Sequence, residues 1–135
     1  MATRWSAAAR GSAIEAVGTM ANGGSVQFRT GTPPASVEDS PTGTLLVTVD
    51  LQSPAFGSAS DGEITANGLP LESVGDENGE IGYARIVDSS GDPVYDEDDV
   101  STSSESKITV NTLTVSQGVD FELVAMTLRA RNPSS

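Results

Sequence analysis

The chain begins with a stretch in which apolar and small side chains recur every three or four residues, the period of an α-helix. These positions are Trp5, Ala8, Ala9, Ala13, Ile14, Ala16, Val17 and Met20. Thr3 is a typical N-cap residue, and Asn22-Gly23-Gly24 has the composition that ends helices. The pattern therefore predicts a helix over residues 3–22. Gly11 and Gly18 each weaken it by about 1 kcal/mol relative to alanine, so we expect this helix to need a surface to pack on.

After residue 24 the apolar period changes to two, which is typical of half-buried β-strands. The alternation is clearest in residues 44–51, where Leu45, Val47, Val49 and Leu51 share one face. It returns in residues 119–130, where it places Phe121, Leu123 and Ala125 inside. Shorter strands are predicted at residues 25–30, 63–66, 69–71, 81–88, 93–96, 107–110 and 113–116. The polar or Gly- and Pro-rich segments between them, residues 31–43, 52–62, 72–80 and 96–106, are predicted loops.

Many short strands separated by turn residues, after one leading helix, predict a mainly β fold. We expect an antiparallel β-sandwich or a jelly-roll-like barrel with one N-terminal α-helix. The length of 135 residues suits one domain. We divide the chain into an N-terminal helix or arm (residues 1–24), a β-sandwich domain (residues 25–130) and a frayed tail (residues 131–135).

Composition narrows the chemistry that this fold can carry. Aromatic residues make up only 4% of the chain, so the core has to be built mainly from Val, Ile, Leu and Ala. There is no cysteine and no histidine, which excludes disulfides, Cys/His zinc sites and Ser-His-Asp or Cys-His catalysis. The acidic residues 96–99 suit a cation poorly, because neighbours in an extended segment point in opposite directions. We therefore expect no enzymatic activity, no metal and no cofactor.

The formal charge of −12 is unevenly distributed. Residues 38–122 have a net charge of −16, whereas residues 1–37 and residues 123–135 each carry +2. This balance argues against nucleic acid as a partner, since binding phosphates requires a basic surface. Two interpretations remain: the acidic body is simply solvated, or the two basic ends meet an acidic surface of a partner.

No part of the sequence is typical of a membrane segment. No apolar run approaches the roughly 18 residues that span a bilayer. Residues 1–24 also lack the continuous apolar stretch of a signal peptide. We therefore expect no membrane association and no export by the usual route.

The helix and the basic C-terminal segment hold the residues that we expect to bind a partner. Trp5 is the only tryptophan, and tryptophan and arginine dominate binding hot spots. Trp5 either packs on its own domain, as a single tryptophan commonly does, or fills a pocket of a partner. On the second interpretation the partner-binding residues are Arg4, Trp5, Arg10, Ile14 and Arg129.

Several short segments carry a resemblance to a known group of proteins. They are Asn22-Gly23-Gly24 after the Ala-rich helix, Arg29-Thr30-Gly31-Thr32-Pro33-Pro34, Gly43-Thr44-Leu45-Leu46-Val47-Thr48, Pro54-Ala55-Phe56-Gly57 and Ile86-Val87-Asp88-Ser89-Ser90-Gly91. In this order they resemble small virion proteins of tailed bacteriophages, encoded among the head and tail genes. The resemblance spans about residues 3–128.

The resemblance implies a structural protein of the virion, a capsid cement (decoration) protein of the β-sandwich type. It implies the major capsid protein as a partner and a homo-oligomer, with a trimer favoured. It also implies a place on the capsid surface after synthesis in the cytoplasm of the bacterial host. The acid-rich loops at residues 72–80 and 96–106 differ from the more neutral turns of that group.

Two other functions stay open at the level of sequence. A tail or fibre-base adaptor would share the helix and the sandwich and would differ only in what it docks on. A host-surface binding module would recognise a glycan or a protein through the acidic loops. The number of copies in the virion separates the cement function from the adaptor function, and binding to glycans favours the host-surface module.

Overall fold

The computed structural model describes residues 4–130, which form one helix and eleven strands. The helix is α1 (Ala7–Met20). The strands are β1 (Ser25–Arg29), β2 (Leu45–Asp50), β3 (Glu63–Thr65), β4 (Leu71–Val74), β5 (Gly79–Glu80), β6 (Tyr83–Val87), β7 (Pro93–Glu97), β8 (Val100–Ser101), β9 (Ile108–Val110), β10 (Thr114–Val115) and β11 (Asp120–Arg129). The predicted frayed tail, residues 131–135, and the predicted N-cap Thr3 lie outside the described residues.

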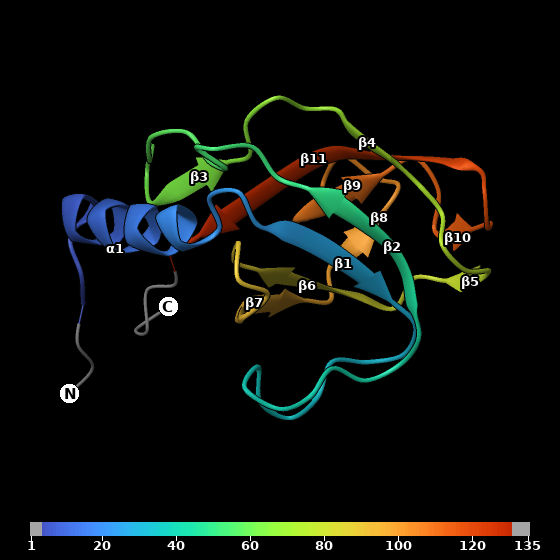
Figure 1. Cartoon of the computed structure of the whole chain (residues 1–135). Coiled ribbons are helices and arrows are strands. Elements are labelled where there is room, and N and C mark those ends of the chain that lie inside the picture. The colour runs from blue at the N-terminus through green and yellow to red at the C-terminus, as the bar shows by residue number, and fades with distance from the viewer. Residues whose placement is uncertain (1–3, 131–135) are drawn as a thin grey trace.

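Most of the strands belong to two sheets (Figure 1). One sheet has the order β2-β1-β6-β7. In the other, β11 has β9 and then β8 on one side, with β4 and β3 paired in succession along its other side. Strands β5 and β10 form a small separate pair, and the pairing of β8 with β9 is parallel. The prediction of a mainly β, antiparallel sandwich is confirmed, and the described residues contain no closed barrel.

The core lies between the two sheets and has few aromatic side chains. Phe28 of β1 and Phe121 of β11 bring the sheets together, with ring centroids 5.1 Å apart. Aliphatic side chains surround this pair; the fully buried ones include Val26, Leu46, Val47, Val49, Ile64, Ile86, Ile108 and Leu123. Burial of this apolar surface is the main favourable contribution to folding.

Helix α1 lies at one end of the sandwich, beside β3 and the end of β11 (Figure 1). It begins at Ala7 rather than at residue 3, because Ser6 is the N-cap: its Oγ accepts a hydrogen bond from the Ala9 N–H over 3.1 Å. Trp5 therefore precedes the helix. As predicted, the helix packs on a surface, and the closest approach is at Gly18. A Cβ atom added there would lie only 2.7 Å from Ile64 Cδ1 of β3, so the helix backbone packs directly on that strand.

The prediction of which β2 side chains lie inside is only partly confirmed. Val47 and Val49 are fully buried, as predicted, but Leu45 is half-buried and Leu46 is buried in its place. The reason is a shift in the pairing of β1 with β2, next to Arg29. An extra residue in one strand reverses the alternation beyond it.

Strand β11 shows the same deviation. Phe121 and Leu123 are buried, as predicted, whereas Ala125 is half-buried and Met126 is buried. Here the pairing of β11 with β9 shifts between Leu123 and Ala125. The prediction that Ala125 lies inside is therefore wrong, again because a bulge interrupts the period of two.

Two predicted loops contain short strands. Residues 72–80 hold β5 and most of β4, and residues 96–106 hold β8 and the end of β7. Strands β5 and β8 are only two residues long, too short to show an alternation in the sequence. Strand β7 was predicted at residues 93–96 and extends one residue further. Residues 31–43 are a loop, as predicted, and contain no strand.

Candidate functional site

An apolar groove lies where α1 meets the edge strand β7 and the end of β11. Its volume is about 410 Å³. The helix side supplies Ala13, Ile14 and Val17, with Trp5 just before the helix, and the sheet side supplies Val94, Tyr95, Leu128, Arg129 and Ala130. The groove thus joins three segments that are distant in sequence.

Trp5, which precedes α1, and Ile14, which lies within it, contribute to the groove in different ways. Trp5 is 43% exposed, and its carbonyl oxygen accepts a hydrogen bond from Arg10 Nη1 over 3.1 Å. The Arg10 side chain in turn lies against Gly62, where an added Cβ would be 3.1 Å from its Nε. Ile14 is only 6% exposed and belongs to the core. Arg10 therefore contacts the main chain at Trp5, while Ile14 fixes the helix to the sandwich.

The sheet side of the groove includes Tyr95, whose hydroxyl group lies in the interior. The Tyr95 hydroxyl is buried and has no hydrogen-bond partner within residues 4–130. Burial, and to a lesser degree the charge of Glu97, raises the pKa of Tyr95 far above its usual value. The hydroxyl therefore stays neutral, and it can donate or accept a hydrogen bond.

One basic residue, Arg129, lines the groove, although most of the chain is acidic. Arg129 is more than half exposed, with its Nε 3.4 Å from Glu63 Oε2, a long contact of the kind that contributes little in solvent. Arg4, next to Trp5 in the chain, is also exposed. Both guanidinium groups are therefore accessible to an acidic partner.

The structure brings together most of the residues that the sequence singled out. Trp5, Ile14 and Arg129 line the groove, and Arg10 supports Trp5. Arg4 does not line it. The sequence reading missed the wall formed by β7 and the end of β11, namely Val94, Tyr95, Leu128 and Ala130. The signal that could have found it was Tyr95, one of six aromatic residues, in the strand predicted at residues 93–96.

Other kinds of site are not apparent in the described part of the chain. No group of three or more acidic side chains there is placed to hold a metal ion. No helix within it is long and apolar enough to cross a membrane. No family model, curated protein or solved structure matches the chain.

Proposed function

We propose that this chain is a non-enzymatic structural protein of a bacteriophage virion, a cement protein that binds and stabilises the capsid shell. The observation that carries the proposal is the apolar groove rimmed by Trp5 and Arg129 on an otherwise acidic protein. The resemblance of its short segments to small virion proteins supports the same function. The occupant of the groove is an apolar segment of the major capsid protein flanked by Asp or Glu.

The distribution of charge favours attachment to the shell through the groove end of the molecule. Residues 38–122 carry a net charge of −16, and burying many of these carboxylates against a partner would be costly. The groove end offers Trp5 and two exposed arginines instead, the residue types that contribute most to binding energy. The acidic body then faces solvent and keeps free copies apart before assembly.

Counting the copies in purified virions tests the function as a whole. Quantitative mass spectrometry of particles of the phage that encodes the chain gives the ratio of this protein to the major capsid protein. We expect hundreds of copies per particle, arranged as homo-oligomers with a trimer favoured. A handful of copies would instead identify a tail or fibre-base adaptor, and absence from the particle would overturn both.

Replacing Trp5 by alanine tests the groove. We expect the affinity for particles stripped of this protein to fall at least 30-fold, the equivalent of about 2 kcal/mol for a hot-spot tryptophan. Met20→Ala is the matched control, because Met20 is an apolar residue of α1 that is 56% exposed and lies outside the groove. Add-back of purified protein to stripped particles, followed by sedimentation, measures both variants. Equal binding by Trp5→Ala and Met20→Ala would place attachment elsewhere.

Tyr95→Phe separates docking from stability. In the free protein this change removes a buried hydroxyl without a partner among the described residues, so we expect the melting temperature to stay the same or rise. Because the hydroxyl is buried, a docked segment does not reach it, so binding to stripped particles should stay the same. A fall in melting temperature would mean that the hydroxyl already has a partner in the free protein.

A further inference from the structure

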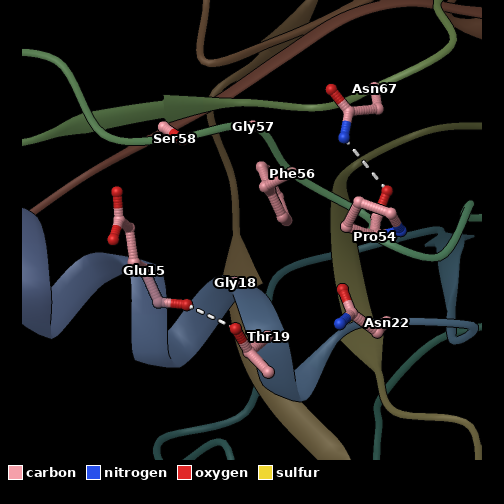
Figure 2. Close-up of a pocket in the computed structure, with 9 residues that line it drawn as sticks. All are labelled: Glu15, Gly18, Thr19, Asn22, Pro54, Phe56, Gly57, Ser58 and Asn67. Atoms are coloured by element: carbon pink, nitrogen blue, oxygen red, sulfur yellow. Dashed lines mark hydrogen bonds between the residues drawn. The ribbon is translucent and has the colours of Figure 1, made fainter.

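A second cavity, unlike the groove in chemistry, lies on another side of helix α1. Its volume is about 330 Å³, at the lower end of the range for small-molecule sites. Figure 2 shows Glu15, Thr19 and Asn22 on the helix side, facing Ser58 and Asn67 on the loop side, with Phe56 between them. At 100° per residue, the helix positions of this cavity point well away from Ala13 and Val17 of the groove. A partner in the groove therefore leaves this cavity open.

Three side chains of the cavity are held in place by a backbone hydrogen bond at one of their two polar atoms. Glu15 Oε2 accepts from the Ala59 N–H over 2.6 Å, and Asn22 Oδ1 accepts from the Ala55 N–H over 2.8 Å. Asn67 Nδ2 donates to the Pro54 carbonyl oxygen over 3.1 Å, the bond drawn in Figure 2. Each bond fixes the orientation of its carboxylate or amide group.

The second polar atom of each side chain can form a hydrogen bond with solvent or with a ligand. Asn22 Nδ2 is a donor, while Asn67 Oδ1 and Glu15 Oε1 are acceptors, and none of them has a hydrogen-bond partner among the residues described. The Ser58 hydroxyl can donate or accept. Polar groups that are already oriented lose little conformational entropy on binding.

This combination has a defined chemical preference. A ligand with adjacent hydroxyl groups can donate to the two acceptors and accept from the donor at the same time. The Glu15 carboxylate disfavours an anionic ligand, because two like charges at close range repel each other. Phe56 lines the cavity but adds only a small apolar surface to it, since it is 7% exposed.

We propose that this cavity binds one neutral sugar ring. The ring places adjacent hydroxyls between Asn22, just after the helix, and Asn67 on the loop, with Glu15 accepting from a third. The site is separate from the proposed docking groove, and it would serve recognition of a neutral glycan by a copy of the protein already on the particle.

Nuclear magnetic resonance titration of the full chain tests the proposal. The probes are glucose, galactose, mannose and N-acetylglucosamine, with N-acetylneuraminic acid as the anionic sugar and glycerol as the open-chain polyol. We expect at least one neutral sugar to shift the Ala55 and Ala59 amide signals in a saturable way, with a Kd of about 1 mM. We expect no saturable shift from the anionic sugar or from glycerol.

Two variants and a matched control locate the site. Asn67→Ala removes an acceptor, and Gly57→Ala adds a methyl group 3.5 Å from Asn67 Oδ1, an ordinary contact that leaves the fold intact. Each should weaken binding at least tenfold. Asn78→Ala is the control, because Asn78 is also fixed by one backbone hydrogen bond, from the Gln117 N–H, but lies outside the cavity.

Three results would overturn the proposal. One is the absence of a saturable shift from any neutral sugar at about ten times the expected Kd. Another is unchanged binding by both Asn67→Ala and Gly57→Ala in proteins whose remaining amide signals match those of the parent chain. The third is binding of the anionic sugar as tight as that of the neutral ones. None of these results bears on the groove, which is tested on stripped particles.

Discussion

Arg85→Met should lower the free energy of unfolding by about 3–5 kcal/mol, a large part of the roughly 5–15 kcal/mol that stabilises a domain. Arg85 is the one buried charged residue in the described part of the chain. Its Nε and Nη2 donate to the two carboxylate oxygens of Asp96 over 2.8 and 3.0 Å, and its Nη1 donates to the Asp39 carbonyl oxygen over 2.9 Å. The variant leaves the Asp96 carboxylate, which is 11% exposed, without its partner.

The same arginine also fixes a long loop to the outer face of the sheet. Asp39 belongs to the segment between β1 and β2, so Arg85 ties that segment to β6 and β7. Tyr83 of β6 adds a second tie, because its hydroxyl donates to the Thr42 carbonyl oxygen over 2.8 Å. In Arg85→Met we therefore expect faster hydrogen exchange and proteolysis in residues 31–43, even under conditions where the sandwich remains folded.

Urea unfolding of a double variant separates the ion pair from simple loss of packing. Arg85→Met with Asp96→Leu removes both charges, and replacing a complete buried pair by apolar residues commonly costs far less than breaking it. We expect the double variant to be more stable than Arg85→Met alone. If the two losses simply add, the pair is not coupled and the loss in Arg85→Met comes from packing.

The sequence predicted the class of fold because its signals are local. The alternation around Val47 and Val49 and around Phe121 and Leu123 depends on neighbouring residues only, and these four side chains are buried. The helix, predicted to end at residue 22, ends at Met20, close to the predicted glycine stop. Such local patterns predict burial correctly because a strand with one buried face points every second side chain inward.

The errors arise where distant parts of the chain decide the local structure. A bulge depends on the partner strand, so the burial of Leu46 and Met126 could not be read from their own segments. The helix start depends on which of several capping residues is used, and Ser6 is used. Short polar strands such as β8 exist only because a neighbouring strand offers hydrogen bonds.

For the same reason, the sequence predicted some residues of the groove but not the groove itself. The chemistry of Trp5 and Arg129 marks them as binding residues wherever they lie. That they share one groove follows from the long-range packing of α1 beside β11, which no local pattern encodes. The Tyr95 wall and the pairing of Arg85 with Asp96 likewise depend on how β7 returns along β6.

Val47→Asp should abolish the cooperative fold or lower its stability by several kcal/mol. Val47 is fully buried and lies opposite Phe28 in the pairing of β1 with β2, so the variant places an ionised carboxylate between the two sheets without a partner. Glu122→Ala should change stability by no more than about 0.5 kcal/mol, because Glu122 lies between two buried residues of β11 and points the other way. Chemical unfolding followed by circular dichroism measures both.

The same measurement decides between a regular β11 and one that contains a bulge. If the alternation of Phe121 and Leu123 continued, residue 125 would lie inside and residue 126 outside. With the bulge, Met126 is in the core, and Met126→Ala should cost about 2–5 kcal/mol through the cavity it leaves. Ala125→Ser adds a hydroxyl at a half-buried position and should cost well under 1 kcal/mol. The opposite ranking of these two variants would mean that β11 runs without a bulge. Each side chain after residue 124, including Leu128 and Arg129 of the groove, would then lie on the opposite face of the strand.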